Sequence, residues 1–477
     1  MSVISFSSSS PSSVESQSLL STQTYRSTAI VANEPLDKQG QFNYEAARRY
    51  FPAQIIVDMR ALTQNMKRLV AETKKYNPQA QVLGVVKADG YGHGLIASAL
   101  AALAGGATWL GTAKVSEALL LRQAGIGPDR AHILGWMSSA LDAPYEELIL
   151  NNIDLGIGSF DAIHAACQAA QQCHTKARLH IAVDTGFGRN GFTPAEFDQA
   201  LSLLQDGTQR GLLDIVGLYS HLAVADAPQN QEFVQCTDQQ IESFNQFVDR
   251  MTAVGLKPQI RHLANTAATF SRPDIHFELV RPGNGFYGYE ADPAMGTPAD
   301  FGLVPAMSLQ AQLGTIKTLP AHHAISYGRT YITDQETSIA IVPLGYADGI
   351  QRSASGSNEL GSLHCDHQGG PVRVMTAQGP RLCTVSGRVC MDQFLIDLHG
   401  LASDLQVKEG DTVQLFAPGR GAKYCEPTAD DWAESADTIN YVIYTCLRNR
   451  IPRLYLHAKE VLSENDLQLL DQRSILS

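Results

Sequence analysis

Eight short apolar segments, separated mostly by stretches with helical periodicity, limit the architectures open to this chain. The strand candidates are 82–87, 108–112, 131–135, 153–156, 177–183, 213–219, 258–263 and 277–280. The helical stretches between them include 94–104, 115–124, 160–173, 194–205 and 232–254. A repeated strand-then-helix pattern predicts an α/β fold with a parallel sheet, and eight repeats over this length favour a TIM-type (β/α)8 barrel. A doubly wound open sheet is the structural alternative.

After Pro305 the sequence pattern changes from alternating strands and helices to short apolar segments separated by turns, which predicts a second domain that consists mostly of β-strands. Turn signals such as Gly369-Gly370 and Gly410-Asp411 separate its short strands. The predicted strands are 307–317, 338–343, 372–375, 382–390, 393–397 and 412–416, with 437–447 as a final short helix or strand. A further strand, 54–57, and a helix, 59–74, precede the repeats. We therefore expect a barrel over residues 46–302 and a C-terminal β domain over 303–477.

The N-terminal segment has a composition that cannot build a packed core. Residues 1–21 contain eleven serines, so we expect residues 1–45 to form a disordered, serine-rich tail. The basic start and apolar stretch of a secretory signal are missing. A serine-rich organellar transit peptide is the alternative, with Arg26 as the one basic residue before Lys38.

Composition narrows the class of protein. Hydrophobic residues make up 44% of the 477 residues, and charged residues 18%, which is enough apolar material for a large core. A formal net charge of -12, without a basic run, argues against a nucleic-acid partner. No stretch approaches the ~20 apolar residues of a membrane span. The eight cysteines form no CxxC pair, which is typical of reduced thiols in a cytoplasmic protein, and we interpret His364-Cys365-Asp366-His367 as a loop, with no metal site expected.

Lys87 is the residue that points most directly to chemistry. It ends the apolar run 82–86 and is followed at once by the glycine-rich segment 88–94. Desolvation lowers the pKa of a lysine, so a neutral, nucleophilic amine becomes available near pH 7. Nucleophilic lysines form Schiff bases with carbonyl compounds, including pyridoxal phosphate (PLP).

The chain also offers the other groups that PLP requires. Backbone N–H groups and hydroxyls bind phosphate, and barrels often place this site after the seventh and eighth strands, where Asn265-Thr266 and Arg281–Gly285 occur. Arg281 could face the pyridine nitrogen and keep it unprotonated, because a guanidinium only donates. Tyr327 could act as a base if positive charge, from His221 or Arg281, stabilised its phenolate. Each of these residues alone has an ordinary structural interpretation as well.

Several segments, taken together, resemble the alanine racemases in content and in order. They cover roughly residues 50–460 and comprise Val85–Gly94, Val183–Gly191, His221–Asp226, His262–Ala268, Val280–Gly283, Ser326–Gly328, Pro343–Gly349, Gly387–Gln393 and Thr438–Tyr441. The resemblance implies a PLP enzyme that interconverts L- and D-alanine, supplies D-alanine for cell-wall peptidoglycan and works as a head-to-tail homodimer with shared active sites.

The resemblance also assigns expected roles to individual residues. Lys87 would bind the cofactor and act as the base on D-alanine, and Tyr327 of the other subunit would act as the base on L-alanine. His221 would link Arg281 to Tyr327. The remaining cofactor contacts would be Tyr91, Thr266, Gly283, Asn284 and Tyr441, and the substrate or entrance contacts would be Arg189, Met391, Tyr346 and Asp392.

One position departs from the family pattern, and three alternative functions remain. Many members carry a lysine, modified to a carbamate that orients the arginine, where this chain has Ala182. Arg189 must then be oriented by another group, by a bound anion or by nothing so specific. The alternatives are a broader amino-acid racemase acting for example on serine, a PLP decarboxylase of related fold, and a PLP-binding protein without catalysis.

Overall fold

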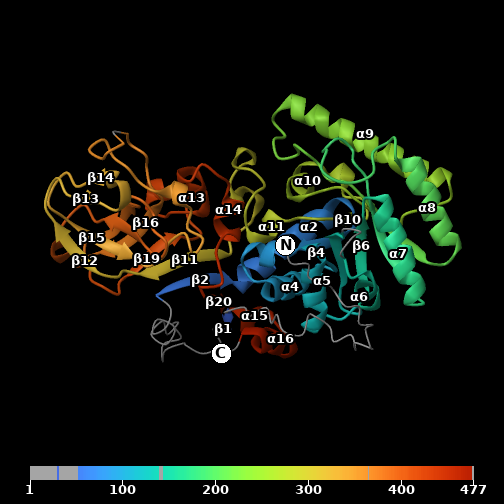
Figure 1. The fold of residues 1–477 in the computed structure, drawn as a ribbon, viewed down its shortest axis with the longest axis horizontal. Coiled ribbons are helices and arrows are strands. Elements are labelled where there is room, and N and C mark those ends of the chain that lie inside the picture. The colour runs from blue at the N-terminus through green and yellow to red at the C-terminus, as the bar shows by residue number, and fades with distance from the viewer. Residues whose placement is uncertain (1–28, 32–51, 139–142, 364, 475–477) are drawn as a thin grey trace, which may run out of the picture.

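A computed structural model describes residues 29–31, 52–138, 143–363 and 365–474. Two lobes lie side by side in it, an α/β lobe and a β-rich lobe (Figure 1). Of the predicted N-terminal tail, only β1 (Ala29–Val31) falls within the described residues. That strand runs parallel to a strand near the C-terminus.

The α/β lobe is the predicted barrel. Its eight strands are all parallel and follow the order β10-β3-β4-β5-β6-β7-β8-β9. They are β3 (Gln81–Val85), β4 (Trp109–Lys114), β5 (His132–Met137), β6 (Ile153–Ile157), β7 (Ala177–Ala182), β8 (Leu213–Tyr219), β9 (Ile260–His262) and β10 (Leu279–Val280). The backbone N–H of Arg281 donates to the carbonyl of Ala264 at 2.9 Å, which joins the ends of β9 and β10. The barrel is therefore nearly closed, and the open sheet is excluded.

Helices surround the barrel strands (Figure 1). They are α2 (Met59–Tyr76), α3 (Lys87–Tyr91), α4 (Leu95–Ala104), α5 (Val115–Gln123), α6 (Tyr145–Leu150), α7 (Phe160–Gln172), α8 (Phe197–Gln209), α9 (Gln231–Ala253), α10 (Thr266–Ser271) and α11 (Asn284–Tyr287). The first of them illustrates why they form: Asp58 caps α2 by accepting from the N–H groups of Arg60 and Ala61. Leu62, Met66 and Leu69 then form its buried face.

The β-rich lobe contains a seven-stranded sheet, a three-stranded sheet and a two-stranded ribbon. Its strands are β11 (Met307–Gln312), β12 (Ile316–Leu319), β13 (Ala324–Ile325), β14 (Tyr331–Ile332), β15 (Thr337–Val342), β16 (Pro371–Thr376), β17 (Gly379–Thr384), β18 (Phe394–Asp397), β19 (Thr412–Phe416) and β20 (Arg453–Leu456). Its helices are α12 (Ala402–Leu405), α13 (Ala429–Ser435) and α14 (Asn440–Thr445), whereas α15 (Ala458–Val461) and α16 (Glu464–Ser474) pack against α2 and α4 of the barrel lobe. This lobe confirms the predicted β-rich C-terminal part.

Several details of the C-terminal part differ from the sequence expectation. The predicted strand 382–390 is β17 (Gly379–Thr384), which ends at Thr384, and the predicted final element 437–447 is helix α14, which β20, α15 and α16 follow. The single strand predicted over 307–317 is wrong: the chain leaves one sheet after β11 and enters another at β12, because Gly314 donates its N–H to the Ile341 carbonyl of β15. The predicted strand 54–57 exists as β2 (Ala53–Asp58), but it pairs with β11 and β20 of the seven-stranded sheet. A segment that precedes the barrel in sequence therefore belongs to the other lobe.

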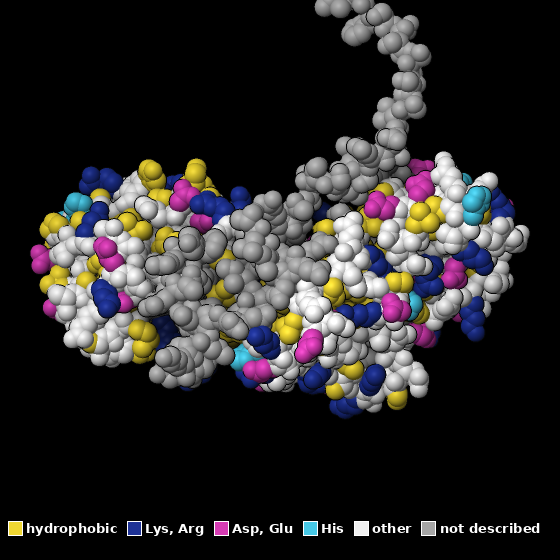
Figure 2. Space-filling view, turned by 90° about the horizontal axis from the view of Figure 1, so that it is seen from below, with side chains coloured by type: hydrophobic (Ala, Val, Ile, Leu, Met, Phe, Trp, Pro, Cys, Tyr) yellow, Lys and Arg dark blue, Asp and Glu magenta, His cyan; other side chains and the backbone are white. Residues whose placement is uncertain are grey.

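Acidic and basic side chains are interspersed on the face of the molecule drawn in Figure 2. No helix within the described ranges combines the length and the apolar composition needed to cross a bilayer. All eight cysteines are described, and all are free thiols. Among the described residues no three metal-ligating side chains gather at one point; His364 lies outside them.

Candidate active site

Lys87 lies just beyond the end of β3, at the C-terminal mouth of the barrel. Its side chain is half-buried, and its Nζ lies 5.8 Å from the ring centroids of Tyr91 and Trp136. Burial lowers the pKa of the Lys87 amine, and the charge of Arg189 lowers it further, while Glu117 acts in the opposite direction. The surroundings of Lys87 therefore shift its pKa in the direction that makes the neutral, nucleophilic amine more accessible, as its sequence context predicted.

The backbone after Lys87 forms an unusual left-handed turn. Ala88, Asp89, Gly90 and Tyr91 all have φ between 48° and 60°. Such a conformation costs roughly 1–2 kcal/mol for each residue other than glycine, so neighbours must hold it. Glu117 accepts from the Asp89 N–H at 3.0 Å, and Asp89 in turn accepts from the Leu95 N–H at 2.8 Å.

A residue of the β-rich lobe completes the support of this turn. The side chain of Arg453, on β20, is 2% exposed. It donates to the Gly92 carbonyl at 2.7 Å and forms an ion pair with Asp89 at 3.5 Å. The position of Lys87 thus depends on both lobes, which the sequence did not reveal.

The residues expected to bind phosphate gather next to this turn. The Thr266 hydroxyl accepts from the backbone N–H groups of Gly283 at 2.9 Å and Gly285 at 3.3 Å. A Cβ on Gly283 would lie 2.6 Å from the Tyr91 hydroxyl, so any larger residue there would have to displace the Tyr91 side chain. The Asn284 side chain accepts from Tyr444, and the Tyr441 ring lies 5.9 Å from that of Tyr91. The structure thus brings together all five residues that the sequence grouped.

Arg281 is buried beside them, at the end of β10. Its guanidinium donates to the carbonyls of His262 and Ser220 and lies 5.6 Å from the Tyr219 ring centroid. Burial lowers the Arg281 pKa to about 10, so the group remains a cation at neutral pH. The Tyr219 hydroxyl is also buried and has no hydrogen-bond partner among the described residues.

His221 contributes a neutral ring to the same region. Burial lowers its pKa to about 3, with the charges of Arg281, Arg189 and Lys87 acting in the same direction. Its ring lies 5.5 Å from that of Phe187. Within the described chain, Arg281 bonds to His262 and Ser220 and makes no hydrogen bond to the His221 ring.

Arg189 extends from the loop after β7 and is exposed. Its guanidinium lies 4.2 Å from the Phe187 ring centroid and has no hydrogen-bond partner among the described residues. Ala182 is 3% exposed and is paired with Tyr219 across β7 and β8, so no side-chain group at this position can orient Arg189. Among the described residues, the contact with the Phe187 ring is the interaction that can orient the Arg189 guanidinium.

The remaining predicted residues lie in the β-rich lobe. Tyr327 is 71% exposed in a short turn after β13, and Met391 and Tyr346 are also exposed. The Tyr346 and Met391 segments are joined, because the Tyr346 N–H donates to the Cys390 carbonyl at 3.0 Å. Asp392 accepts from Arg450 at 2.8 Å. Within the described residues of one chain, no hydrogen bond or ring contact links Tyr327 to Lys87.

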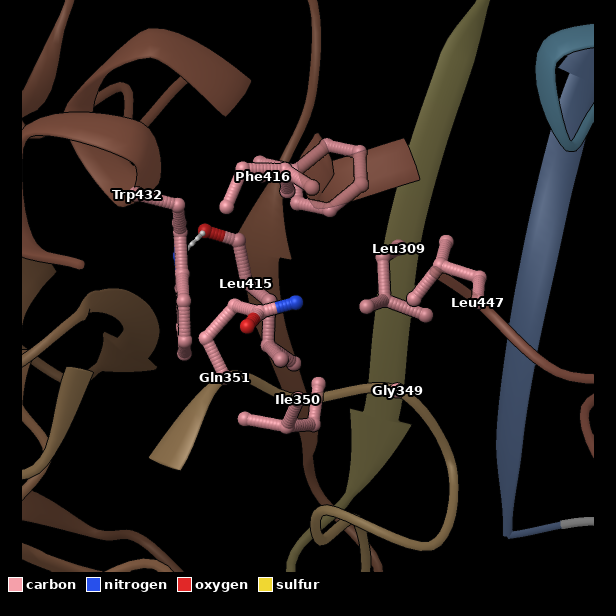
Figure 3. Close-up of a pocket in the computed structure, with 9 residues that line it drawn as sticks. Leu309, Gly349, Ile350, Gln351, Leu415, Phe416, Trp432 and Leu447 are labelled. Atoms are coloured by element: carbon pink, nitrogen blue, oxygen red, sulfur yellow. Dashed lines mark hydrogen bonds between the residues drawn. The ribbon is translucent and has the colours of Figure 1, made fainter. Parts of the chain in front are cut away.

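A small cavity elsewhere in the β-rich lobe offers no such chemistry (Figure 3). Its lining comprises Leu309, Gly349, Ile350, Gln351, Leu415, Phe416, Trp432, Ile443 and Leu447. The one polar ring group there, the Trp432 indole N–H, donates to the Leu415 carbonyl at 2.7 Å. No ionisable side chain lines it, so the Lys87 region is the candidate site.

The residues at the barrel mouth fit PLP. Lys87 supplies an amine with a lowered pKa, and the Thr266 hydroxyl lies beside the backbone of Gly283, where a phosphate could come close to the N–H groups. Arg281 supplies a buried cation whose orientation is fixed by hydrogen bonds. Fold and site together define the class of barrel enzymes that use a nucleophilic lysine beside a phosphate-binding mouth.

Comparison with known proteins identifies the family within that class. Residues 57–291 match the model "Alanine racemase, N-terminal domain", and residues 306–455 match "Alanine racemase, C-terminal domain". The chain belongs to the alanine racemase family. It is 44% identical to the alanine racemase of Thermobifida fusca over 406 residues, which cover 85% of this chain and 98% of that protein.

Solved structures agree with this assignment. The alanine racemase of Streptomyces coelicolor A3(2) has a TM-score of 0.76 and 40% identity, with 86% of this chain and 100% of that chain covered. The alanine racemase of Streptomyces lavendulae has a TM-score of 0.75 and 37% identity, with 85% and 97% covered.

Proposed function

We propose that this chain is a PLP-dependent alanine racemase that interconverts L-alanine and D-alanine and supplies D-alanine for peptidoglycan. The observation that carries the proposal is the half-buried Lys87 amine, held on a left-handed turn beside Thr266, Gly283 and Arg281. Family membership supports the same reaction. The eight free thiols support a cytoplasmic location.

The chain's own residues would hold the cofactor at three points. Lys87 would bind it covalently, while Tyr91, Thr266, Gly283, Asn284 and Tyr441 would surround its phosphate. Arg281 would donate to the pyridine nitrogen, and since a guanidinium only donates, that nitrogen would stay unprotonated. When bound, PLP acidifies the Cα–H bond of an amino acid. The Tyr219 hydroxyl, buried without a partner, offers a further donor at this position.

Racemisation requires a proton-transfer group on each face of the substrate Cα. Lys87 would serve one face. The other base would be Tyr327 of the partner subunit, because Tyr327 is 71% exposed and, within the described part of its own chain, makes no hydrogen bond or ring contact with Lys87. We therefore propose a homodimer in which each site combines the barrel of one chain with the β-rich lobe of the other. Neutral His221, close to three cations, would lie between these groups.

The substrate would be bound by residues of both lobes. Arg189 would pair with its carboxylate, supported by the Phe187 ring. Met391, Tyr346 and Asp392 of the partner subunit would line the entrance and favour a small side chain. The limits 1–45, 46–302 and 303–477 remain our proposed division of the chain, with β2 placed in the C-terminal sheet.

The decisive experiment is incorporation of deuterium at Cα in heavy water, measured on a panel of L- and D-amino acids that includes alanine and serine. We expect exchange with inversion for both enantiomers of alanine, without release of CO2. Lys87→Ala should abolish exchange together with the visible absorbance of the bound cofactor. The exposed Lys74→Ala variant, on α2, is the matched control and should retain both. An active, colourless Lys87→Ala protein would refute the assignment.

A further inference from the structure

The interior of this barrel contains a column of polar side chains where such barrels are usually filled by apolar layers. Asp154 on β6, His180 on β7 and His262 on β9 are 1%, 0% and 0% exposed, and Arg281 is 9% exposed. Burying groups of this kind is costly unless each is hydrogen-bonded. The column therefore has to be connected throughout.

The contacts are continuous from one end of the column to the other. Arg178 donates to the two oxygens of Asp154 at 2.7 and 3.0 Å. Asp154 lies 3.3 Å from Nε2 of His180, and Nδ1 of His180 lies 2.8 Å from Nε2 of His262. Nδ1 of His262 then lies 3.0 Å from a guanidinium nitrogen of Arg281.

The two ends of this chain of contacts fix the direction of every hydrogen bond in it. Arg281 can only donate, so Nδ1 of His262 must accept, and its proton must then be on Nε2. That proton is donated to Nδ1 of His180, whose own proton is on Nε2 and is donated to Asp154. Asp154, as a carboxylate, can only accept. A single arrangement of protons therefore satisfies every hydrogen bond from Arg281 to Asp154.

The charge states agree with this arrangement. Burial lowers the His262 pKa well below its ordinary value, helped by Arg281 and His180, so this ring is neutral. Burial alone would raise the pKa of the Asp154 carboxyl, but hydrogen bonds from His180 and Arg178 hold it below its usual range. Asp154 is thus an anion paired with Arg178.

The surrounding residues are shaped to hold the two imidazoles. A Cβ on Gly217 would lie 2.2 Å from Nδ1 of His180, so the glycine leaves the space that this ring occupies. The His262 ring is stacked on that of Tyr219, with centroids 5.0 Å apart and 14° between the planes. The edge of the Trp109 ring system packs against His180 at 5.3 Å. Neither imidazole can rotate without displacing a neighbour.

We propose that Asp154 is a positioning residue that, through the fixed tautomers of His180 and His262, holds Arg281 in the orientation needed at the cofactor site. Without the carboxylate, His180 is free to carry its proton on Nδ1. His262 would then have to accept at Nε2 and carry its proton on Nδ1, facing the N–H groups of Arg281. Two donors would oppose each other, and Arg281 would turn away from this contact.

The first test uses the protein without cofactor and does not depend on the proposed reaction. NMR of protein labelled with 15N in its histidines reports which ring nitrogen carries the proton. We expect the ring proton of His180 and that of His262 to be on Nε2 in both cases, as the hydrogen bonds to Asp154 and from Arg281 require. A proton on Nδ1 of either ring, or a protonated imidazolium, would overturn the proposal whatever the enzyme catalyses.

The second test adds a variant and a matched control. In Asp154→Leu, a similar volume without an acceptor, we expect the His262 tautomer to change. We also expect the affinity for PLP to fall roughly tenfold, a typical loss when the partner that orients a binding group is removed. Asp214→Asn alters the other carboxylate beside Arg178, 3.4 Å away, and leaves the contacts of Asp154 in place, so both readouts should stay as in the wild type.

The outcomes separate this inference from the proposed function, on which its role at the cofactor site rests. Equal effects of the two variants, or an Asp154→Leu protein with unchanged tautomers and PLP affinity, would overturn the positioning role while racemisation stands. If Asp154→Leu does not fold, the wild-type tautomers alone decide. If the protein proved not to be a racemase, the NMR measurement of the His180 and His262 tautomers would still test the hydrogen-bond chain.

Discussion

Glu290 is a buried carboxyl where the barrel meets the C-terminal helices. It is 4% exposed, and its Oε2 has no hydrogen-bond partner among the described residues. Nearby, the Asn284 side chain donates to the Glu290 carbonyl at 2.8 Å and lies 3.4 Å from Asn440 of α14. Burial raises the Glu290 pKa to about 7, with the charges of Asp430, Asp292 and Asp300 adding to the effect. The folded protein therefore prefers this group in its neutral form.

This shift predicts that Glu290 makes the stability fall as the pH rises. The folded state binds the proton more tightly than the unfolded state, so the contribution is complete below about pH 4.5 and is lost as the pH passes 7. The loss is on the order of 3 kcal/mol. Glu290→Gln should remove this dependence. In urea titrations, the free energy of unfolding of the variant should therefore rise relative to that of the wild type as the pH increases from 5 to 8. The exposed Glu434→Gln on α13 is the control; a constant Glu290→Gln difference across that range would contradict the prediction.

The left-handed turn that carries Lys87 is the element on which the site depends most directly. Its geometry is imposed by contacts from α5, from α4 and from β20, so it is a product of tertiary structure. Gly90 lies at its centre with φ of +60°, and a Cβ there would lie 2.3 Å from the Ser98 hydroxyl. Gly211, after α8, has φ of +74° with nothing within 4 Å of such a Cβ.

These two glycines separate backbone strain from crowding. Gly211→Ala adds only the left-handed strain, about 1 kcal/mol. Gly90→Ala adds the same strain and a clash with Ser98, so we expect a loss of roughly 2–4 kcal/mol. Urea unfolding of the two variants measures the difference. Gly90→Ala should also weaken PLP binding, because the turn positions Lys87. Equal destabilisation by the two substitutions would mean that the turn has room to relax.

The sequence predicted elements better than the contacts between them. Each barrel strand was located within a few residues, because apolar runs and helical periodicity are local signals. The pairing of β2 with β11 was not predictable in this way, since those strands are about 250 residues apart. For the same reason the contact of Arg453 with the Lys87 turn and the proposed role of Asp154 were missed, although His262 belongs to a recognised segment and Tyr219 lies two residues before another.

The molecule as a whole presents the residues of one proposed site on two separate lobes. Arg453 and β2 fasten the barrel to the seven-stranded sheet, so the lobes are held in place from within the chain. Tyr327 lies on the exposed surface of the β-rich lobe, together with Tyr346 and Met391. A second copy of the chain is the partner that could bring this surface to Lys87, since a symmetric dimer would build two such sites at once.

Mixing two inactive variants tests this arrangement. In a heterodimer of Lys87→Ala and Tyr327→Phe chains, one shared site would carry both defects and the other would carry neither. Random pairing of equal amounts gives half heterodimers with one intact site of two, so about a quarter of the wild-type rate should return. Each variant alone should stay inactive after the same mixing procedure, which is the control. If both groups came from one chain, every site in the mixture would lack one of them and no activity would return. Recovery near a quarter therefore requires that Lys87 and Tyr327 of the partner subunit act on the same substrate.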